Sequence, residues 1–181
     1  MVESQGKRKY EFSWDTTVGA DINIARPDLG PNTHIEVYRL FQFTLRDVLE
    51  QHYGADMADE LLREAGVLAG RHFFRQYCAD AKDLNALIKR VTEEFKRLGI
   101  GIFRMEKSDP AKLDFIFTVC EDLDCSGMPD TSEVICVYDE GFIRGILEEF
   151  TGEGFSVREV DCWCTGDRSC RFEAKLSQGE K

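Results

Sequence analysis

The sequence lacks any apolar run of membrane-spanning length, and positive charge is scarce in it. Lys and Arg number 23 against 34 Asp and Glu, which gives a net charge of -11 at pH 7, and the basic residues are interleaved with acidic ones. This balance would repel phosphate backbones, so direct nucleic-acid binding is not expected. No apolar segment follows the opening residues 1–9. We therefore expect a soluble, cytoplasmic protein that does not contact a membrane.

Two signatures of catalysis are also missing. No Gly-x-Gly-x-x-Gly fingerprint for a dinucleotide is present, and no acid/base pair stands out. We therefore do not expect a catalytic centre. The 181 residues are 43% hydrophobic, which is enough for one globular domain with a core of its own.

Cysteine, by contrast, is plentiful and clustered. Of the 7 cysteines, all except Cys78 lie between residues 120 and 170, and three of them surround a Thr-Gly-Asp turn at 165–167. Several stand beside Asp, Gly or Ser, where a hydrophobic core is not expected, so the cluster predicts metal ligation. A disulfide framework is the weaker interpretation, because the count is odd and nothing directs the chain to an oxidising compartment. Cys78 ends a helical pattern and is interpreted as a packed hydrophobe.

Hydrophobic periodicity predicts helices in the first part of the chain and strands in the second. Apolar residues three and four apart indicate helices over 36–53, 56–73 and 83–98. Alternation then indicates a hairpin over 100–120, a strand over 134–138, a short helix over 139–151, and strands over 155–162 and 169–174. The expected fold class is α+β, with an N-terminal helical layer packed on an antiparallel sheet that has one inserted helix.

The domain organisation predicted is an N-terminal arm and linker over 1–33, a single domain over 34–176 and a tail over 177–181. In the arm, Tyr10, Phe12 and Trp14 alternate like one face of a strand, which would pair with its own sheet or with a partner subunit. The second predicted helix is apolar around much of its circumference. Both features favour a homodimer.

Four segments carry a family resemblance: residues 125–127, 134–145, 158–162 and 166–172. They contain Gly-Phe-Ile-x-Gly, Glu-x-x-Cys and Gly-Asp-x-x-Cys-Arg-Phe in order, and they resemble the 4-vinyl reductase, or hydrocarbon-binding, domain. The likeness covers about residues 100–174, whereas over 30–99 only the helical layout agrees. It implies a fold similar to those of vesicle-tethering subunits and haem-based nitric oxide sensors.

The resemblance also implies a structural zinc ion. Carried over residue by residue, its ligands are Cys136, Glu159, Cys162 and Cys170. In a regular strand Glu159 and Cys162 point to opposite faces, so a bulge or an early strand end is required between them. Cys125 competes as the fourth ligand without needing a bulge, although the resemblance places Glu159 first. Cys120 and Cys164 remain as spare thiols or as members of a redox switch.

A hydrophobic pocket between the helices and the sheet is the second implied site. Its candidate lining is aromatic: Phe73, Phe74, Tyr77, Phe95, Phe103, Phe115 and Phe117. The same residues also fit a plain packed core. Phe115 stands where aromatic sensors carry a polar anchor, so specificity for phenol is not expected.

These observations together predict a sensor or carrier domain for a hydrophobic or aromatic small molecule, with a structural zinc and a separate partner protein that receives any signal. Two alternatives stay open. One is a reductase or an accessory protein of tetrapyrrole metabolism, and the other is a redox switch that uses Cys120, Cys125 and Cys164.

Overall fold

The computed structural model describes residues 8–177, and the chain divides into two compact units between His34 and Ile35. The first unit contains two short helices, α1 (Trp14–Thr17) and α2 (Ile22–Ala25). The predicted strand at residues 10–14 is therefore wrong. The Thr17 amide donates to the Ser13 carbonyl at 3.0 Å, and the Tyr10 and Thr17 hydroxyls lie 2.8 Å apart. A turn satisfies these groups locally, so no pairing strand is needed.

The second unit begins with the three predicted long helices, which are confirmed: α3 (Ile35–Tyr53), α4 (Ala55–Phe73) and α5 (Leu84–Leu98). A π-helical turn, η1 (Phe74–Cys78), extends α4. Asp83 caps α5 by accepting a hydrogen bond from the Ala86 amide at 2.8 Å. Gly99, with φ of 72°, ends it in the left-handed conformation that glycine adopts readily.

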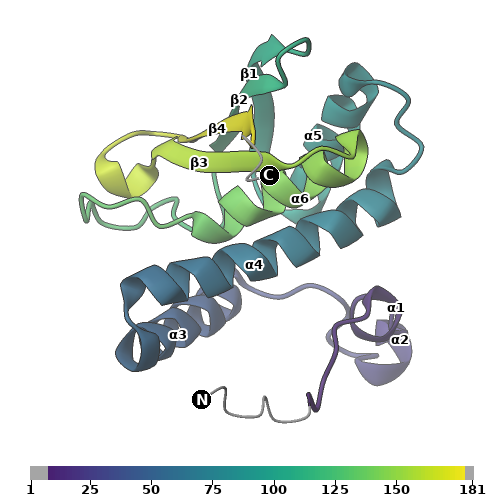
Figure 1. Cartoon of the computed structure of the whole chain (residues 1–181). Coiled ribbons are helices and arrows are strands. Elements are labelled where there is room, and N and C mark those ends of the chain that lie inside the picture. Colours follow the sequence, from purple (N-terminus) through teal and green to yellow (C-terminus); the bar gives the residue numbers. More distant parts are fainter. Residues whose placement is uncertain (1–7, 178–181) are drawn as a thin grey trace, which may run out of the picture. The chain divides into compact units, whose positions relative to one another are not determined.

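Four antiparallel strands form one sheet in the order β1-β2-β4-β3 (Figure 1). They are β1 (Ile102–Asp109), β2 (Asp114–Cys120), β3 (Phe155–Asp161) and β4 (Cys170–Leu176), as the alternation predicts. The predicted strand at 134–138 is wrong, because α6 (Val137–Thr151) already begins there. The amides of Asp139 and Glu140 donate to the Cys136 carbonyl, and their carboxylates favour a helix N-terminus.

Helix α6 lies between α4 and the sheet, and most of its residues are buried (Figure 1). Its contact with α4 is close enough for backbones to touch. A Cβ added to Gly70 would lie 2.1 Å from the Phe142 carbonyl oxygen, and one added to Gly141 would lie 2.0 Å from that of Arg63. Only glycine permits this approach.

The other side of this helical layer is open in the described part of the chain. Helix α3 buries none of its residues there, and α4 buries only the side that carries Ala58, Leu62 and Phe73. Met57 is 50% exposed and Leu68 is 45% exposed. The prediction that α4 is buried on more than one side is therefore not met by the described residues of one chain. None of their helices is both long and apolar enough to cross a bilayer.

Candidate metal centre and neighbouring cavities

Four cysteines from separate elements converge at one end of the sheet. Cys125 lies in the loop after β2, Cys136 precedes α6, Cys162 follows β3 and Cys170 opens β4. All four are buried, and their Sγ atoms lie within 4.8 Å of one another. The Sγ atom of Cys136 lies 3.9 Å from that of Cys162 and 3.7 Å from that of Cys170, while the Sγ atoms of Cys125 and Cys170 are 3.1 Å apart. Tetrahedral zinc thiolates need about 3.8 Å between sulfurs, so this donor set fits zinc.

A tight turn returns the chain from Cys162 to Cys170. The amides of Thr165 and Asp167 both donate to the Cys162 carbonyl, and Gly166 adopts φ of 95°. The Cys162 amide donates to the Thr165 hydroxyl at 3.0 Å. These bonds form the short 3-10 helix η2 (Trp163–Thr165) and bring two ligating thiols together across seven intervening residues.

Hydrogen bonds within the sulfur cluster separate the pKa values of its members. Thiols of Cys125, Cys136 and Cys170 donate toward Cys162 and lower its pKa, whereas the pKa values of Cys136 and Cys170 are raised. One thiolate is therefore stabilised by its neighbours. A thiolate is the form that ligates a metal.

Glu159 lies beside the cluster, and the bulge that its position requires is present. The register of β3 against β4 shifts between Glu159 and Asp161, so the predicted irregularity is confirmed. Glu159 Oε2 accepts a hydrogen bond from the Cys136 amide at 3.0 Å, while Oε1 has no partner among the described residues. Burial, followed by the charge of Cys162, raises the pKa of Glu159 to about 9.

The two spare thiols lie outside the set of four. Cys164 is buried within the turn, where its carbonyl accepts hydrogen bonds from the amides of Thr131 and Ser132. Burial and the nearby charge of Cys162 raise its pKa to about 12. A thiol of this kind is poorly reactive, which disfavours Cys164 as a redox residue. Cys120 is half-buried at the end of β2.

Sequence reasoning missed the carboxylate that positions Glu159. Glu140 is 3% exposed, and its Oε1 accepts from the Glu159 amide at 2.8 Å. Its Oε2 pairs with Arg63 Nε at 2.8 Å. Glu140 therefore joins α4, α6 and the bulge of β3. Its place four residues after Cys136 was the available signal.

Helix α3 is tied to the loop that carries Cys125, which the sequence analysis also missed. The Tyr38 hydroxyl and the Gln42 amide donate to the two Asp124 oxygens, each at 2.7 Å. Arg39 donates to the carbonyls of Leu123 and Ser126 at 2.9 and 2.7 Å. Tyr38 and Gln42 are four residues apart and so share one helix face, but their partner lies 86 and 82 residues away in sequence.

The predicted aromatic pocket residues form a continuous packed core. Ring centroids lie 5.8 Å apart between Phe73 and Phe95, 5.1 Å between Phe95 and Phe103, and 5.2 Å between Phe103 and Phe117. Phe115 continues the series beyond Phe117, and Tyr77 packs on Phe73. Between α5, α6 and the sheet the remaining cavity is about 10 Å³. That is barely enough for one water molecule.

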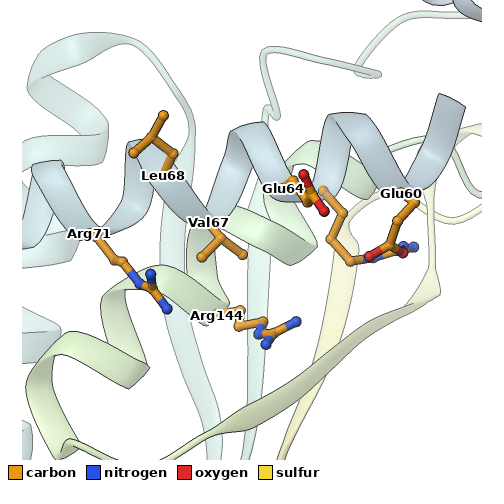
Figure 2. A pocket seen from close by; sticks show the side chains of 7 residues that line it. Glu60, Glu64, Val67, Leu68, Arg71 and Arg144 are labelled. Atoms are coloured by element: carbon orange, nitrogen blue, oxygen red, sulfur yellow. The ribbon is translucent and has the colours of Figure 1, made fainter. Parts of the chain in front are cut away.

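Larger hollows lie on the charged outer side of α4 and α6. One of about 400 Å³ is lined by Glu60, Arg63, Glu64, Val67, Leu68, Arg71 and Arg144 (Figure 2). A neighbour of about 360 Å³ includes Arg71, Arg144 and Glu148. Acids and bases alternate in both, so neither matches the expected apolar ligand pocket.

Comparison with known proteins agrees with this architecture. Residues 115–176 match the family model of the 4-vinyl reductase domain. The uncharacterized protein MJ1642 of Methanocaldococcus jannaschii is 25% identical over 155 residues, which cover 85% of this chain and 84% of that protein. The structure of a vinyl-4-reductase family protein from Methanocaldococcus jannaschii has a TM-score of 0.60 at 18% identity, covering 94% of this chain and 99% of the other.

Two further structures share the fold. The phenol-responsive sensory domain of the transcription activator PoxR, solved with phenol, has a TM-score of 0.63 at 16% identity and covers 82% of this chain and 77% of its own. Trafficking protein particle complex subunit 3 from Naegleria fowleri has a TM-score of 0.62 at 12% identity, with coverages of 80% and 95%. An H-NOX mutant reaches 0.50 at 16% identity, covering 83% of this chain and 77% of its own. The α+β fold expected from the resemblance is confirmed.

Proposed function

Residues 115–176 of this chain belong to the 4-vinyl reductase domain family, and on that premise we propose that the protein is a binding domain for a small hydrophobic molecule, stabilised by a structural zinc ion. It would act as a sensor or carrier and pass any signal to a separate partner. The fold shared with the phenol-responsive domain of PoxR supports the ligand class. The convergence of four buried thiols is the observation that carries the zinc.

The proposed zinc ligands are Cys125, Cys136, Cys162 and Cys170. Four protein ligands leave no position for a reactive water, which supports a structural task. The ion would join the loop after β2, the start of α6, the end of β3 and the start of β4. Glu159 would then orient Cys136 through the amide of that residue instead of binding the metal. This assignment differs from the order that the family resemblance favours.

Zinc content tests the assignment. The purified protein should hold about one zinc per chain, and Cys170→Ser should lose the metal together with several kcal/mol of stability, on the order of the binding energy that a structural site supplies. Cys164→Ser is the matched control, since this thiol is buried in the same turn but lies outside the set of four. Equal zinc retention in both variants would contradict the site.

The fourth ligand can be distinguished in the same assay. Cys125→Ser should weaken zinc retention more than Glu159→Gln, and X-ray absorption at the zinc edge should report four sulfur neighbours. Three sulfurs with one lighter neighbour would instead place Glu159 in the coordination shell.

The hydrophobic ligand would enter between α5, α6 and the sheet, where Leu87, Phe103, Phe117 and Ile143 now close around about 10 Å³. Binding therefore requires these side chains to move apart. Native mass spectrometry of protein from its own host should show a bound apolar molecule that dissociates on unfolding. Ile143→Phe should exclude it by filling the space, whereas Val160→Phe on the exposed face of β3 should not. Protein that carries no adduct and binds no apolar probe would refute the proposal.

A further inference from the structure

A second cavity, separate from the hydrophobic core, lies where α3 passes the loop after β2 and the first turns of α6. Its volume is about 170 Å³, and it is lined by Tyr38, Ile100, Leu123, Asp124, Tyr138, Asp139 and Phe142. Tyr38, Ile100, Leu123 and Tyr138 are partly exposed, so its mouth reaches solvent. Asp124 and Asp139 are only 2% and 8% exposed, so they form its inner end.

Acidic groups gather at this inner end without a cation. Asp122, directly behind, is 2% exposed, and its carboxylate lies within 4.8 Å of that of Asp139. Asp122 Oδ1 accepts from the Asp124 amide at 2.8 Å, but the buried Oδ2 has no hydrogen-bond partner among the described residues. None of the ion pairs within residues 8–177 includes any of these three aspartates.

The neighbouring donors do not supply the missing positive charge. Asp124 is bonded by a neutral hydroxyl from Tyr38 and a neutral amide from Gln42. Arg39 donates instead to two backbone carbonyls of the loop. Buried carboxylates this close together require a proton or a cation between them.

We propose that this cavity binds a small organic cation, a primary ammonium on a compact aromatic or branched aliphatic body. The ammonium group would donate to Asp124 and Asp139, while Ile100, Leu123 and Phe142 would cover the apolar body. The rings of Tyr38 and Tyr138 offer additional cation–π attraction. A cavity of about 150 Å³ accommodates a benzene-sized body, so the 170 Å³ found here suits a benzylammonium-sized ligand.

The site is independent of the hydrophobic ligand and of the zinc. It lies on the α3 side of Phe142, whereas the core cavity is lined by Leu87, Phe117 and Ile143. Because Tyr38 and Asp124 belong to different segments that the ligand would bridge, binding should also slow amide exchange in α3 and in the 121–128 loop.

Titration calorimetry of the zinc-loaded protein with benzylammonium and neutral benzyl alcohol tests the proposal at pH 7. Benzylammonium should bind at least tenfold more tightly than the alcohol, because only the ammonium satisfies the carboxylates. Asp139→Asn should remove most of that preference. Glu64→Gln, in the charged hollow outside α4, is the control that should change nothing.

A second variant protects the test against misfolding at Asp139. Leu123→Trp fills the mouth without altering any acid and should abolish benzylammonium binding at unchanged zinc content. Equal affinity for the alcohol, undiminished binding by Asp139→Asn or Leu123→Trp, or no binding of benzylammonium by the native sequence would overturn the site. The last result would mean that shared protons neutralise the carboxylates.

Discussion

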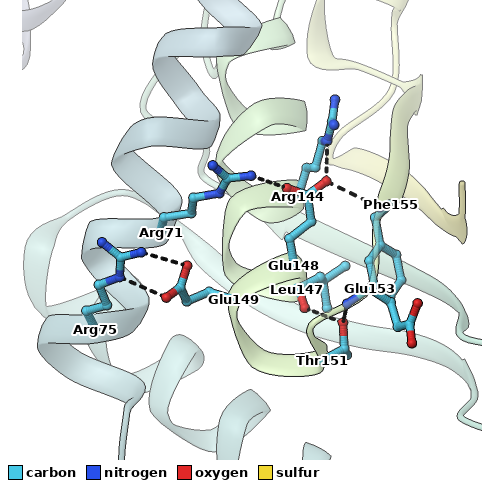
Figure 3. Close-up of polar contacts among 9 residues, drawn as sticks. All are labelled: Arg71, Arg75, Arg144, Leu147, Glu148, Glu149, Thr151, Glu153 and Phe155. Atoms are coloured by element: carbon cyan, nitrogen blue, oxygen red, sulfur yellow. Dashed lines mark hydrogen bonds and ion pairs between the residues drawn. The ribbon is translucent and has the colours of Figure 1, made fainter.

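Glu148 shows how one carboxylate holds three elements together (Figure 3). Its oxygens accept hydrogen bonds from Arg144 at 2.7 Å and from Arg71 at 2.8 Å, which join α6 to α4. The Phe155 amide, at the start of β3, donates to it at 3.3 Å. Burial alone would raise the pKa of Glu148, but the hydrogen bonds from the two guanidinium groups and the amide outweigh it, so its pKa is lowered.

This shift predicts a pH-dependent loss of stability in Glu148→Gln. A lowered pKa means that the ionised form stabilises the fold above the ordinary Glu value, and that this contribution disappears as the pH falls through the lowered pKa. The variant should be less stable by roughly 1 to 2 kcal/mol at pH 7, and the difference should shrink in acid. Urea unfolding at both pH values measures it.

Glu149→Gln is the control, because Glu149 pairs only with the well-exposed Arg75. Its cost should stay within about 0.5 kcal/mol at either pH. Equal costs for the two variants would show that the Glu148 network does not stabilise the contact between α4, α6 and β3.

At the scale of elements, the contact between α4 and α6 depends on glycine. Gly66 and Gly70 on one helix face Gly141 and Gly145 on the other, and at each position an added Cβ would lie within 2.4 Å of a backbone atom. Because α6 also carries Cys136 at its start and packs on β3, its distance from α4 affects the metal centre.

Gly70→Ala should therefore destabilise the domain by about 3 kcal/mol or more, since backbone atoms cannot move aside as a flexible side chain does. Gly154→Ala is the matched control: an added Cβ there is 3.7 Å from the Ser177 Cβ, an ordinary contact. Thermal unfolding compares the two. A small effect at Gly70 would mean that the helices can separate without cost.

For the whole molecule, the exposed apolar face of α3 supports the predicted homodimer. Leu40 and Phe41 are 68% and 69% exposed, and Val37 and Val48 stand on the same face at 56% and 48%. Such a contiguous surface is unusual for a protein that functions as a monomer. A second copy arranged about a two-fold axis would cover both faces at once.

Light scattering at micromolar concentration should then give about twice the 20.7 kDa of one chain. Phe41→Glu should shift the mass to the monomer by placing charge in the apolar interface. Val160→Glu, on an exposed strand position that is 44% accessible, should leave the mass unchanged. A monomeric native protein would contradict the assembly.

Local patterns in the sequence determined the helices over 35–98, the hairpin and the last two strands, because periodicity records which face of an element is buried. Parity along β3 also required the bulge at Glu159. At 134–138 the same reasoning failed: an alternating, β-branched segment became the entry to a helix, because β4 pairs with β2 and the acidic residues cap α6.

Only the tertiary structure decided which side chains meet. The approach of Cys125 to Cys170, the hydrogen bonds from Tyr38 and Gln42 to Asp124, and the filling of the aromatic core each join segments far apart in the chain. Spacing along a sequence limits such contacts only within a single element. Whether a phenylalanine fills a core or lines a cavity, and whether three aspartates share one buried corner, depends on how distant elements pack, because packing at close to crystal density leaves little freedom once the backbones are in place.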